Sequence, residues 1–230
     1  MPQMKSALLI LIALPLCAGM LSENLDEKIA TLTNIVLREQ ITRYTQCGNK
    51  IRKLDSFDSL VNVSDGSEQY SEVRRRNTTY SHLSQIEGMW SFGETITMLR
   101  TTRDVLSNAA GTSNIVSYRC TAADHRWFVM VGPITYWLDF EGTIEVSPQT
   151  GDILRIAWNA ISPPPGAGIA RITWVVDFQS VEIAGHHRTI PATALYRIDR
   201  TGNSRKSEWN VTQFSDAGMY GSESTIRFEP

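Results

Sequence analysis

The sequence lacks an excess of positive charge. It contains 22 Lys and Arg residues against 24 Asp and Glu residues, for a formal net charge of −2. Proteins that bind nucleic acids draw much of their affinity from Lys and Arg side chains that displace counterions. We therefore expect no nucleic-acid partner. The one basic run, Arg74–Arg76, is interpreted as a solvated turn.

The sequence also lacks the motifs of common enzyme classes. It contains no GxSxG elbow, no HExxH pair and no glycine-rich phosphate loop. His186 and His187 are adjacent, so in a strand they would point to opposite faces and could not share a metal. Asp139, Glu141 and Glu145 share one strand face, which we interpret as a solvated polar face. We expect no catalytic residue, no metal site and no cofactor.

Long apolar runs are absent except near the N-terminus, where Lys5 precedes the run Ala7–Leu16 and small residues follow. This run is too short to span a bilayer and has the layout of a secretory signal peptide. The sequence predicts a signal peptide over residues 1–19 and a single periplasmic or secreted domain over residues 20–230, without a transmembrane helix. Lipid anchoring at Cys17 is the less favoured alternative, because Leu16 stands where lipoprotein signals have a small residue.

Cysteine is scarce, with three residues in the chain. Removal of the signal peptide would leave Cys47 and Cys120, and an oxidising compartment would permit a disulfide between them, worth on the order of 4 kcal/mol. The alternative is two buried thiols. No CxxC or CxxH unit is present, which excludes a zinc ribbon.

Alternation of apolar and polar residues is the strongest pattern in the chain. From Ile134 to Ser147, every second position is apolar or Gly142, which predicts one long strand with a buried face and a bend at the glycine. The turn Pro148–Gly151 follows, and a second strand then places Leu154, Ile156 and Trp158 on one side. We therefore expect a hairpin at the centre of the fold.

The rest of the chain continues the strand pattern. Apolar spacing and a Ser91–Glu94 capping box predict helices over residues 23–34 and 92–104. In the strand over residues 170–183 the phase slips, which indicates a β-bulge near Gln179 and Ser180. Pro191 indicates an edge or a bulge in the next strand. Further strands are predicted over residues 35–46, 51–63, 68–75, 115–120 and 127–131, around Trp209 and Val211, and around Ile226 and Phe228.

These elements predict a mostly β fold of the α+β class. Consecutive hairpins imply an antiparallel sheet of about nine to ten strands, and a sheet of that size curls. We expect a curved sheet or half-barrel wrapped around one or two helices, with the helix over residues 92–104 covering its apolar face.

The stretch EGTIEVSPQTGDILRI resembles the strand-turn-strand signature of the bacterial lipoprotein-carrier (LolA/LolB-like) superfamily. The chain is more similar still to secreted bacterial proteins of unknown function related to that superfamily, through LREQITRY, SDGSEQYSEV, WSFGETITMLR, the Pro163–Pro165 connection and SESTIRF. The resemblance covers about Ile35 to Phe228 and implies an apolar cavity between sheet and helix that accepts acyl chains. No residue matches a carrier's docking or handover site.

Aromatic and large apolar residues are the candidate ligand-binding residues. The chain has six tryptophans, and they either fill a wide gap between sheet and helix or line a pocket for an apolar ligand. By strand phase we expect the side chains of six strand residues to face the helix: Tyr136, Leu138, Phe140, Trp158, Trp174 and Phe178. The predicted ligand-binding residues are Trp90, Phe92, Tyr136, Leu138, Phe140, Trp158, Trp174 and Phe178.

Three functions are compatible with the sequence. The leading hypothesis is a non-enzymatic extracytoplasmic protein that binds a lipid or another hydrophobic ligand between sheet and helix. The second is an envelope sensor or scaffold that binds a segment of an envelope protein in the same cleft. A small outer-membrane barrel is less favoured, because the predicted helix interrupts the strands and the chain ends in Glu229-Pro230 without a terminal aromatic residue.

Overall fold

Ten strands of the chain form one antiparallel sheet. The computed structural model describes residues 25–64, 66–76, 92–102, 105–106, 110–112, 114–123, 127–161, 163, 165–202 and 206–219. The strand order is β3-β2-β1-β12-β11-β10-β9-β8-β5-β4, and β6 and β7 form a separate two-stranded sheet. The strands are β1 (Ile35–Cys47), β2 (Lys50–Ser64), β3 (Ser67–Arg76), β4 (Ala110–Thr112), β5 (Ile115–Cys120), β6 (Phe128–Val131), β7 (Ile134–Trp137), β8 (Asp139–Val146), β9 (Ile153–Ile161), β10 (Ile169–Ile183), β11 (His186–Arg200) and β12 (Lys206–Met219).

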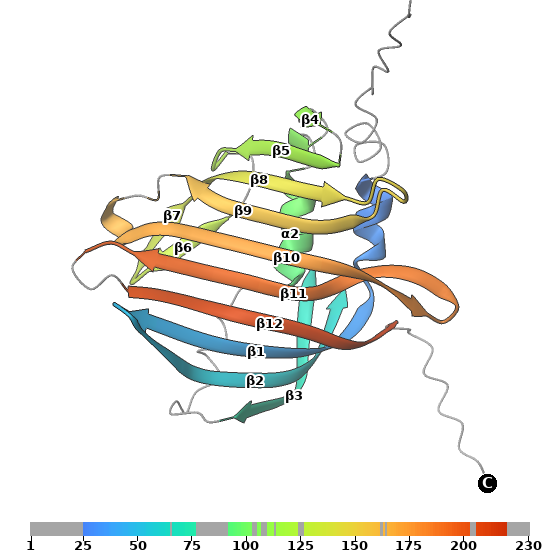
Figure 1. Cartoon of the computed structure of the whole chain (residues 1–230), viewed down its shortest axis with the longest axis horizontal. Coiled ribbons are helices and arrows are strands. Elements are labelled where there is room, and N and C mark those ends of the chain that lie inside the picture. Colours follow the sequence, from blue (N-terminus) through green and yellow to red (C-terminus); the bar gives the residue numbers. More distant parts are fainter. Residues whose placement is uncertain are drawn as a thin grey trace, which may run out of the picture.

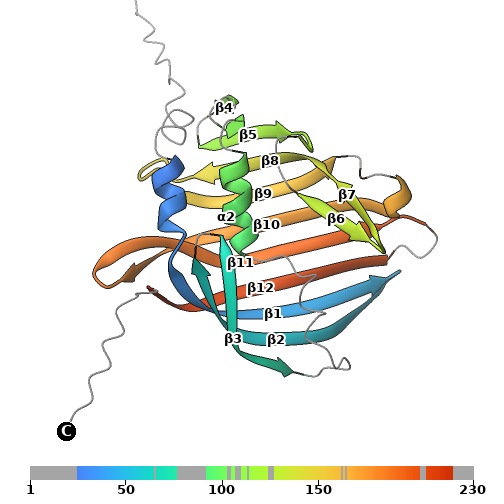
Figure 2. The ribbon, with the colours of Figure 1, turned by 180° about the vertical axis from the view of Figure 1, so that it is seen from behind.

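The sheet is curved, and its concave face is covered by helices (Figures 1 and 2). The cover consists of α2 (Phe92–Thr101), a helical segment over residues 25–31 and the β6–β7 hairpin. Within the described residues, the edge strands β3 and β4 each pair with one neighbour, so the sheet is open. The predicted fold class, a curved antiparallel sheet wrapped around helices, is confirmed.

Alternating burial along the strands defines the concave face. In β1, every second residue from Ile35 to Ile41 is buried, and in β8 every second residue from Phe140 to Val146 is buried. A shift of one residue would expose each of these side chains to water, so burial fixes the register. The apolar core therefore lies between the concave face and its cover.

The prediction of one long strand is wrong, because the strand is interrupted at Leu138. Residues before the break belong to β7, whereas β8 continues in the ten-stranded sheet. Gly142 pairs with Tyr118 and Trp158 without a register shift. A Cβ on Gly142 would lie 2.4 Å from the Cζ atom of Tyr118, so the glycine makes room for the tyrosine ring, whose hydroxyl accepts a hydrogen bond from Trp158 Nε1.

The bulge predicted near Gln179 and Ser180 of β10 is not found, because these residues pair with Ile190 and Thr189 without a shift; the extra residue is instead Ala192 of β11. The register with β11 shifts between Asp177 and Phe178, where Pro191 stands opposite Phe178. β11 lies inside the sheet, so the bulge alternative for Pro191 holds and the edge alternative is wrong. Pairing between β11 and β12 begins only at Thr193. The missing N–H of proline therefore falls where β11 has no β12 residue opposite it.

A disulfide between Cys47 and Cys120 does not fit the fold. Cys47 is exposed at the end of β1 and Cys120 is buried at the end of β5. Five strands separate β1 from β5 in the sheet, a spacing of roughly 29 Å along its surface. Disulfide formation requires Cα atoms within about 7 Å.

The remaining element predictions differ from the structure at their ends. The helical segment that includes residues 25–31 ends three residues before its predicted end, and α2 ends at Thr101, also three residues before its predicted end. His186 and His187 are exposed at the β10–β11 hairpin. The predicted strand around Ile226 and Phe228 lies outside the described residues.

Candidate functional site

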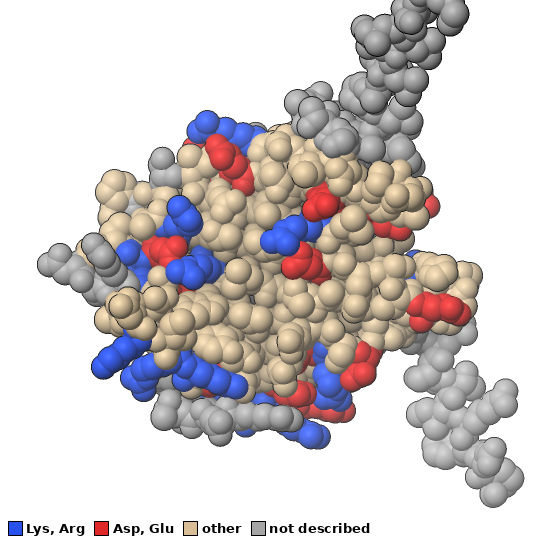
Figure 3. Space-filling view, in the orientation of Figure 1, with Lys and Arg blue, Asp and Glu red and all other residues tan. Residues whose placement is uncertain are grey.

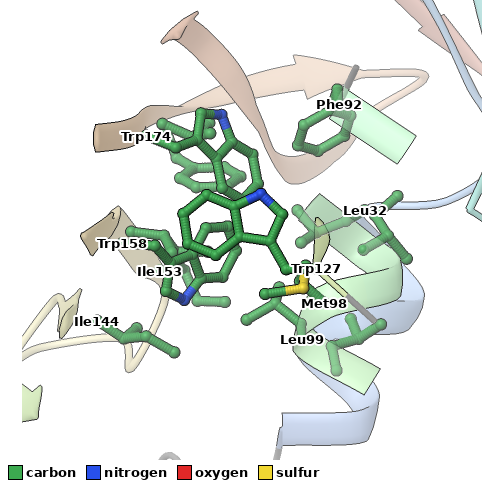
Figure 4. Packing of buried hydrophobic residues seen from close by; sticks show 14 of the residues in the cluster. Leu32, Phe92, Met98, Leu99, Trp127, Ile144, Ile153, Trp158 and Trp174 are labelled. Carbon is green, nitrogen blue, oxygen red and sulfur yellow. The ribbon is translucent and has the colours of Figure 1, made fainter. Parts of the chain in front are cut away.

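The α2 helix packs its apolar face onto the sheet. Phe92, Ile96, Met98 and Leu99 are at most 3% exposed, whereas Arg100 in the last turn is exposed, where a cation complements the helix dipole. Figure 4 shows Met98 and Leu99 facing Trp158 and Trp174 of the sheet, with Trp127 between them. The two sheet tryptophans stack, with ring centroids 4.0 Å apart. This part of the interior is filled by side chains.

The N-terminus of α2 is held by the β2–β3 turn. The Gly93 amide donates a hydrogen bond of 2.7 Å to Glu68 Oε1 of β3, so Glu68 satisfies a backbone N–H that has no partner within the helix. Gly66 and Gly93 permit the close approach, because a Cβ on Gly93 would lie 2.6 Å from the Gly66 carbonyl oxygen. Gly66 also has φ +81°, a conformation that favours glycine.

A cleft lies between the first turn of α2 and strands β10, β11 and β12. The Phe92 ring makes edge contacts with Phe178 and Phe214, each at a centroid distance of 6.0 Å. The space between the walls is about 10 Å³, room for about one water molecule. The cleft is lined by Phe92, Thr95, Trp174, Val176, Ala194, Thr212 and Phe214.

Two buried polar atoms, one in the cleft wall and one on the strand next to Phe214, make no hydrogen bond within the described part of the chain. Thr95 Oγ1 belongs to a cleft residue that is 0% exposed. Glu39 Oε2 belongs to a β1 residue that is 1% exposed and stands opposite Phe214 in the register. Burial raises the pKa of the Glu39 carboxyl well above its usual range, and the Glu68 carboxylate raises it further. Burial thus favours the neutral form of the Glu39 carboxyl, which can donate a hydrogen bond.

The structure brings together part of the predicted residue set. Phe92 and Trp174 line the cleft and Phe178 touches Phe92. Leu138, Phe140 and Trp158 are buried as predicted, but they belong to the filled core and do not line the cleft.

Tyr136 lies apart from the cleft. It is partly buried on the separate β6–β7 hairpin, where its hydroxyl lies near Gly166 of the 3-10 helix η2 (Pro165–Ala167). It therefore packs against the core from the cover instead of from the curved sheet. Trp90 lies outside the described residues.

Sequence reasoning missed several residues of the site. Ala194, Thr212 and Phe214 come from strands whose order in the sheet could not be predicted from local patterns. Glu39 sits among charged residues in LREQ, where it suggests a solvated strand face. Its apolar neighbours at every second position, Leu37 and Ile41, are the available signal that it shares their buried face.

The chemistry of the described residues is that of a binding site. No group of three or more His, Cys, Asp or Glu side chains in this part of the chain is arranged to hold a metal ion. Among the same residues, no helix combines the length and apolar character that crossing a bilayer requires. The cleft offers mostly apolar walls and two threonines, Thr95 and Thr212, and the Glu39 carboxyl belongs to the residue opposite Phe214.

Comparison with known proteins gives structural neighbours only. No family model and no curated protein matches the sequence. Similar solved structures are a LolA superfamily protein from Nitrosomonas europaea (TM-score 0.40, 11% identity, 90% of this chain and 97% of that chain), a DUF1329 family protein from Desulfovibrio piger (0.37, 14%, 94% and 97%) and a putative outer membrane lipoprotein-sorting protein domain from Vibrio parahaemolyticus (0.35, 8%, 90% and 95%). The neighbours include the superfamily that the sequence motifs resemble.

Proposed function

We propose that this chain is a non-enzymatic extracytoplasmic protein that binds an amphipathic ligand, such as a lipid with an acyl chain, between α2 and the concave face of the sheet. The observation that carries the proposal is the cleft itself, whose walls are apolar and whose buried Thr95 hydroxyl makes no hydrogen bond within the described residues. Apolar walls suit an acyl chain, and a few placed polar groups fix the orientation of a ligand.

The small size of the cleft implies that its walls move apart on binding. The strands of the sheet are joined by a continuous ladder of hydrogen bonds, whereas α2 contributes no strand to that ladder. Displacement of α2 therefore leaves the sheet intact, although it separates Phe92 from Phe178 and Phe214. Burial of an acyl chain, at about 0.8 kcal/mol per methylene, compensates for the lost contacts.

The polar groups suit the head of such a ligand. A neutral Glu39 can donate a hydrogen bond and Thr95 can donate or accept one. Export rests on the predicted signal peptide over residues 1–19, and N-terminal sequencing of protein purified from its own envelope tests it. Native mass spectrometry of the same preparation shows whether an acyl ligand or a protein partner copurifies.

Filling the cleft tests the binding site directly. Ala194 lines the cleft, so Ala194→Phe should lower affinity for a fluorescent long-chain fatty acid by about tenfold or more, equivalent to about 1.4 kcal/mol. Ala170→Phe is the matched control, because Ala170 is exposed on β10. Fluorescence titration measures both. Wild-type protein that never takes up the fatty acid, or equal affinities for the two variants, would contradict the proposed site.

A further inference from the structure

The β6–β7 hairpin exposes a ribbon of large apolar side chains. Phe128 is 45% exposed, Met130 61% and Trp137 49%, and all three share one face; Ile134, which is 52% exposed, stands opposite Val131 on the other face, beside the hairpin turn. Phe128 stands opposite Trp137 in the register, and their ring centroids are 5.3 Å apart. The other face of the hairpin, which carries Val129 and Tyr136, packs on the core. The ribbon is therefore an apolar surface left over after the hairpin has contributed to folding.

Basic residues concentrate at one end of the sheet. This end carries the β1–β2 and β11–β12 connections and the first residues of β10. Residues 47–53, 169–171, 197–200 and 206–208 contain seven Lys or Arg residues and two acidic residues, whereas the whole chain has a net charge of −2. The register places Lys50 and Lys206 on either side of Cys47, and Arg200 opposite Ile169, so these segments lie at one end. The seven basic residues are Lys50, Arg52, Lys53, Arg171, Arg197, Arg200 and Lys206.

The two acidic residues at this end already have cationic partners. Asp199 pairs with Arg197 at 2.8 Å, and Glu208 pairs with Arg200 at 3.0 Å and with Lys206 at 2.6 Å. Lys50, Arg52 and Lys53 are exposed at the β1–β2 hairpin, and no acidic residue occurs within residues 47–53. Figure 3 shows Lys and Arg gathered at the lower left, where these strand ends lie.

The apolar ribbon is continuous with the basic end. Tyr136 of the hairpin lies near Gly166 of η2, because a Cβ on Gly166 would be 3.0 Å from the tyrosine hydroxyl. η2 leads directly into β10, whose first residues carry Arg171 and pair with Arg200. Figure 1 shows β6 and β7 reaching the same end of the sheet.

We propose that this end of the molecule docks onto the surface of a lipid bilayer that contains anionic lipids. Trp, Phe and Met side chains on a protruding hairpin insert at the level of the lipid headgroups, where aromatic residues are favoured. The basic residues around them are attracted to the negatively charged membrane surface. Each adds to the binding free energy without having to meet one particular lipid headgroup. Docking does not depend on the proposed acyl ligand, because the cleft residues do not belong to this surface.

Sedimentation with vesicles tests the docking surface. The chain without residues 1–19 should sediment with vesicles of phosphatidylethanolamine and phosphatidylglycerol at 50 mM salt. Pure phosphatidylcholine vesicles should bind it at least tenfold more weakly. Raising the salt to 500 mM should release most of the protein, because screening shortens the range of the attraction. Equal binding to the two vesicle types, or no binding to either, would overturn the proposal.

Paired variants locate the contact. Met130→Asp and the double variant Lys50→Glu/Arg52→Glu should each lower binding to anionic vesicles by about tenfold or more. Leu154→Asp and Arg188→Glu are the controls, because Leu154 is an exposed apolar residue in β9 and Arg188 lies at the opposite, β10–β11 hairpin end. Thermal melts check that each variant is folded. Vesicle binding by Met130→Asp at the wild-type level would overturn the proposal, as would light scattering that shows a dimer disrupted by this substitution.

Discussion

At the scale of single residues, Glu39 is the most unusual group in the fold. A carboxyl that is 1% exposed and has an oxygen without a hydrogen-bond partner among the described residues is costly to ionise, and burial accordingly raises its pKa. Its neighbours in the register are Ser59 and Phe214, neither of which carries a positive charge. Burial of this group costs stability, and Glu39 stands opposite the cleft residue Phe214; carboxyls with such shifted pKa values are common at binding sites.

This pKa shift makes stability depend on pH in a definite direction. The folded state holds the Glu39 proton more tightly than the unfolded state does. The resulting stabilisation of the folded state is fully present below the ordinary pKa of 4.5 and is lost as pH rises through the folded-state pKa. Glu39→Gln, which cannot ionise, should therefore be more stable than wild type at pH 8, by on the order of 1–3 kcal/mol. The difference should shrink as pH falls towards 4.5.

Urea denaturation at several pH values measures this effect. Glu182→Gln is the control, because Glu182 is exposed on β10 and the substitution should leave stability nearly unchanged at every pH. A Glu39→Gln variant that is less stable than wild type at pH 8 would show that the carboxylate is ionised and paired in the folded protein.

The burial of single residues was largely predictable, whereas their grouping was not. Phe140, Trp158 and Trp174 were placed on the buried face by parity alone, because a strand's side chains alternate strictly. The pairing of Glu39 with Phe214 depends on β1 lying next to β12, a contact between distant parts of the sequence. No local pattern encodes such a contact.

At the scale of elements, the position of α2 depends on a pair of glycines. Gly66 in the β2–β3 turn and Gly93 in the first turn of α2 approach so closely that either Cβ would come within 3.0 Å of the facing segment. The same contact allows Glu68 to accept the Gly93 amide hydrogen bond. Because the placement of α2 fixes the positions of Phe92 and Thr95, which line the cleft, the geometry of the cleft depends on this contact as well.

Gly93→Ala should therefore destabilise the protein by about 1–3 kcal/mol, because the added methyl meets the Gly66 carbonyl oxygen, which belongs to the backbone and cannot swing away. The higher helix propensity of alanine offsets part of this loss. Gly218→Ala is the matched control, since no atom lies within 4 Å of a Cβ built there and its φ is not positive. Thermal melts should show a fall of several degrees for Gly93→Ala alone.

Element types were predicted well, and the errors have physical causes. α2, β1, β2 and β10 follow clear periodicities and lie where they were predicted. The sequence does not reveal the break at Leu138, because the apolar alternation continues across it. Tyr136 packs against the core from the cover and Phe140 packs against it from the sheet, although β7 and β8 belong to different sheets. Alternation reports burial and does not report which sheet a strand joins.

At the scale of the whole molecule, the sheet and its cover are held together by different forces. The sheet is a ladder of ten hydrogen-bonded strands, in which the pairing of β1 with β12 joins the two ends of the described sequence. The cover is held by apolar packing and by single polar contacts, such as the Lys28–Asp152 ion pair of 2.5 Å, which joins the helical segment over residues 25–31 to the β8–β9 turn. Opening of the cover therefore requires less free energy than unfolding of the sheet.

Amide hydrogen exchange tests this division. Amides of residues 96–101 in α2 should exchange at least tenfold faster than those of residues 172–176 in β10, because α2 opens without global unfolding and β10 is bonded on both sides. Addition of a long-chain fatty acid should slow exchange in α2 and leave β10 unchanged, because the ligand fills the space between them. Equal exchange in both elements would mean that cover and sheet unfold as one unit, and a ligand would then have to enter without displacement of α2.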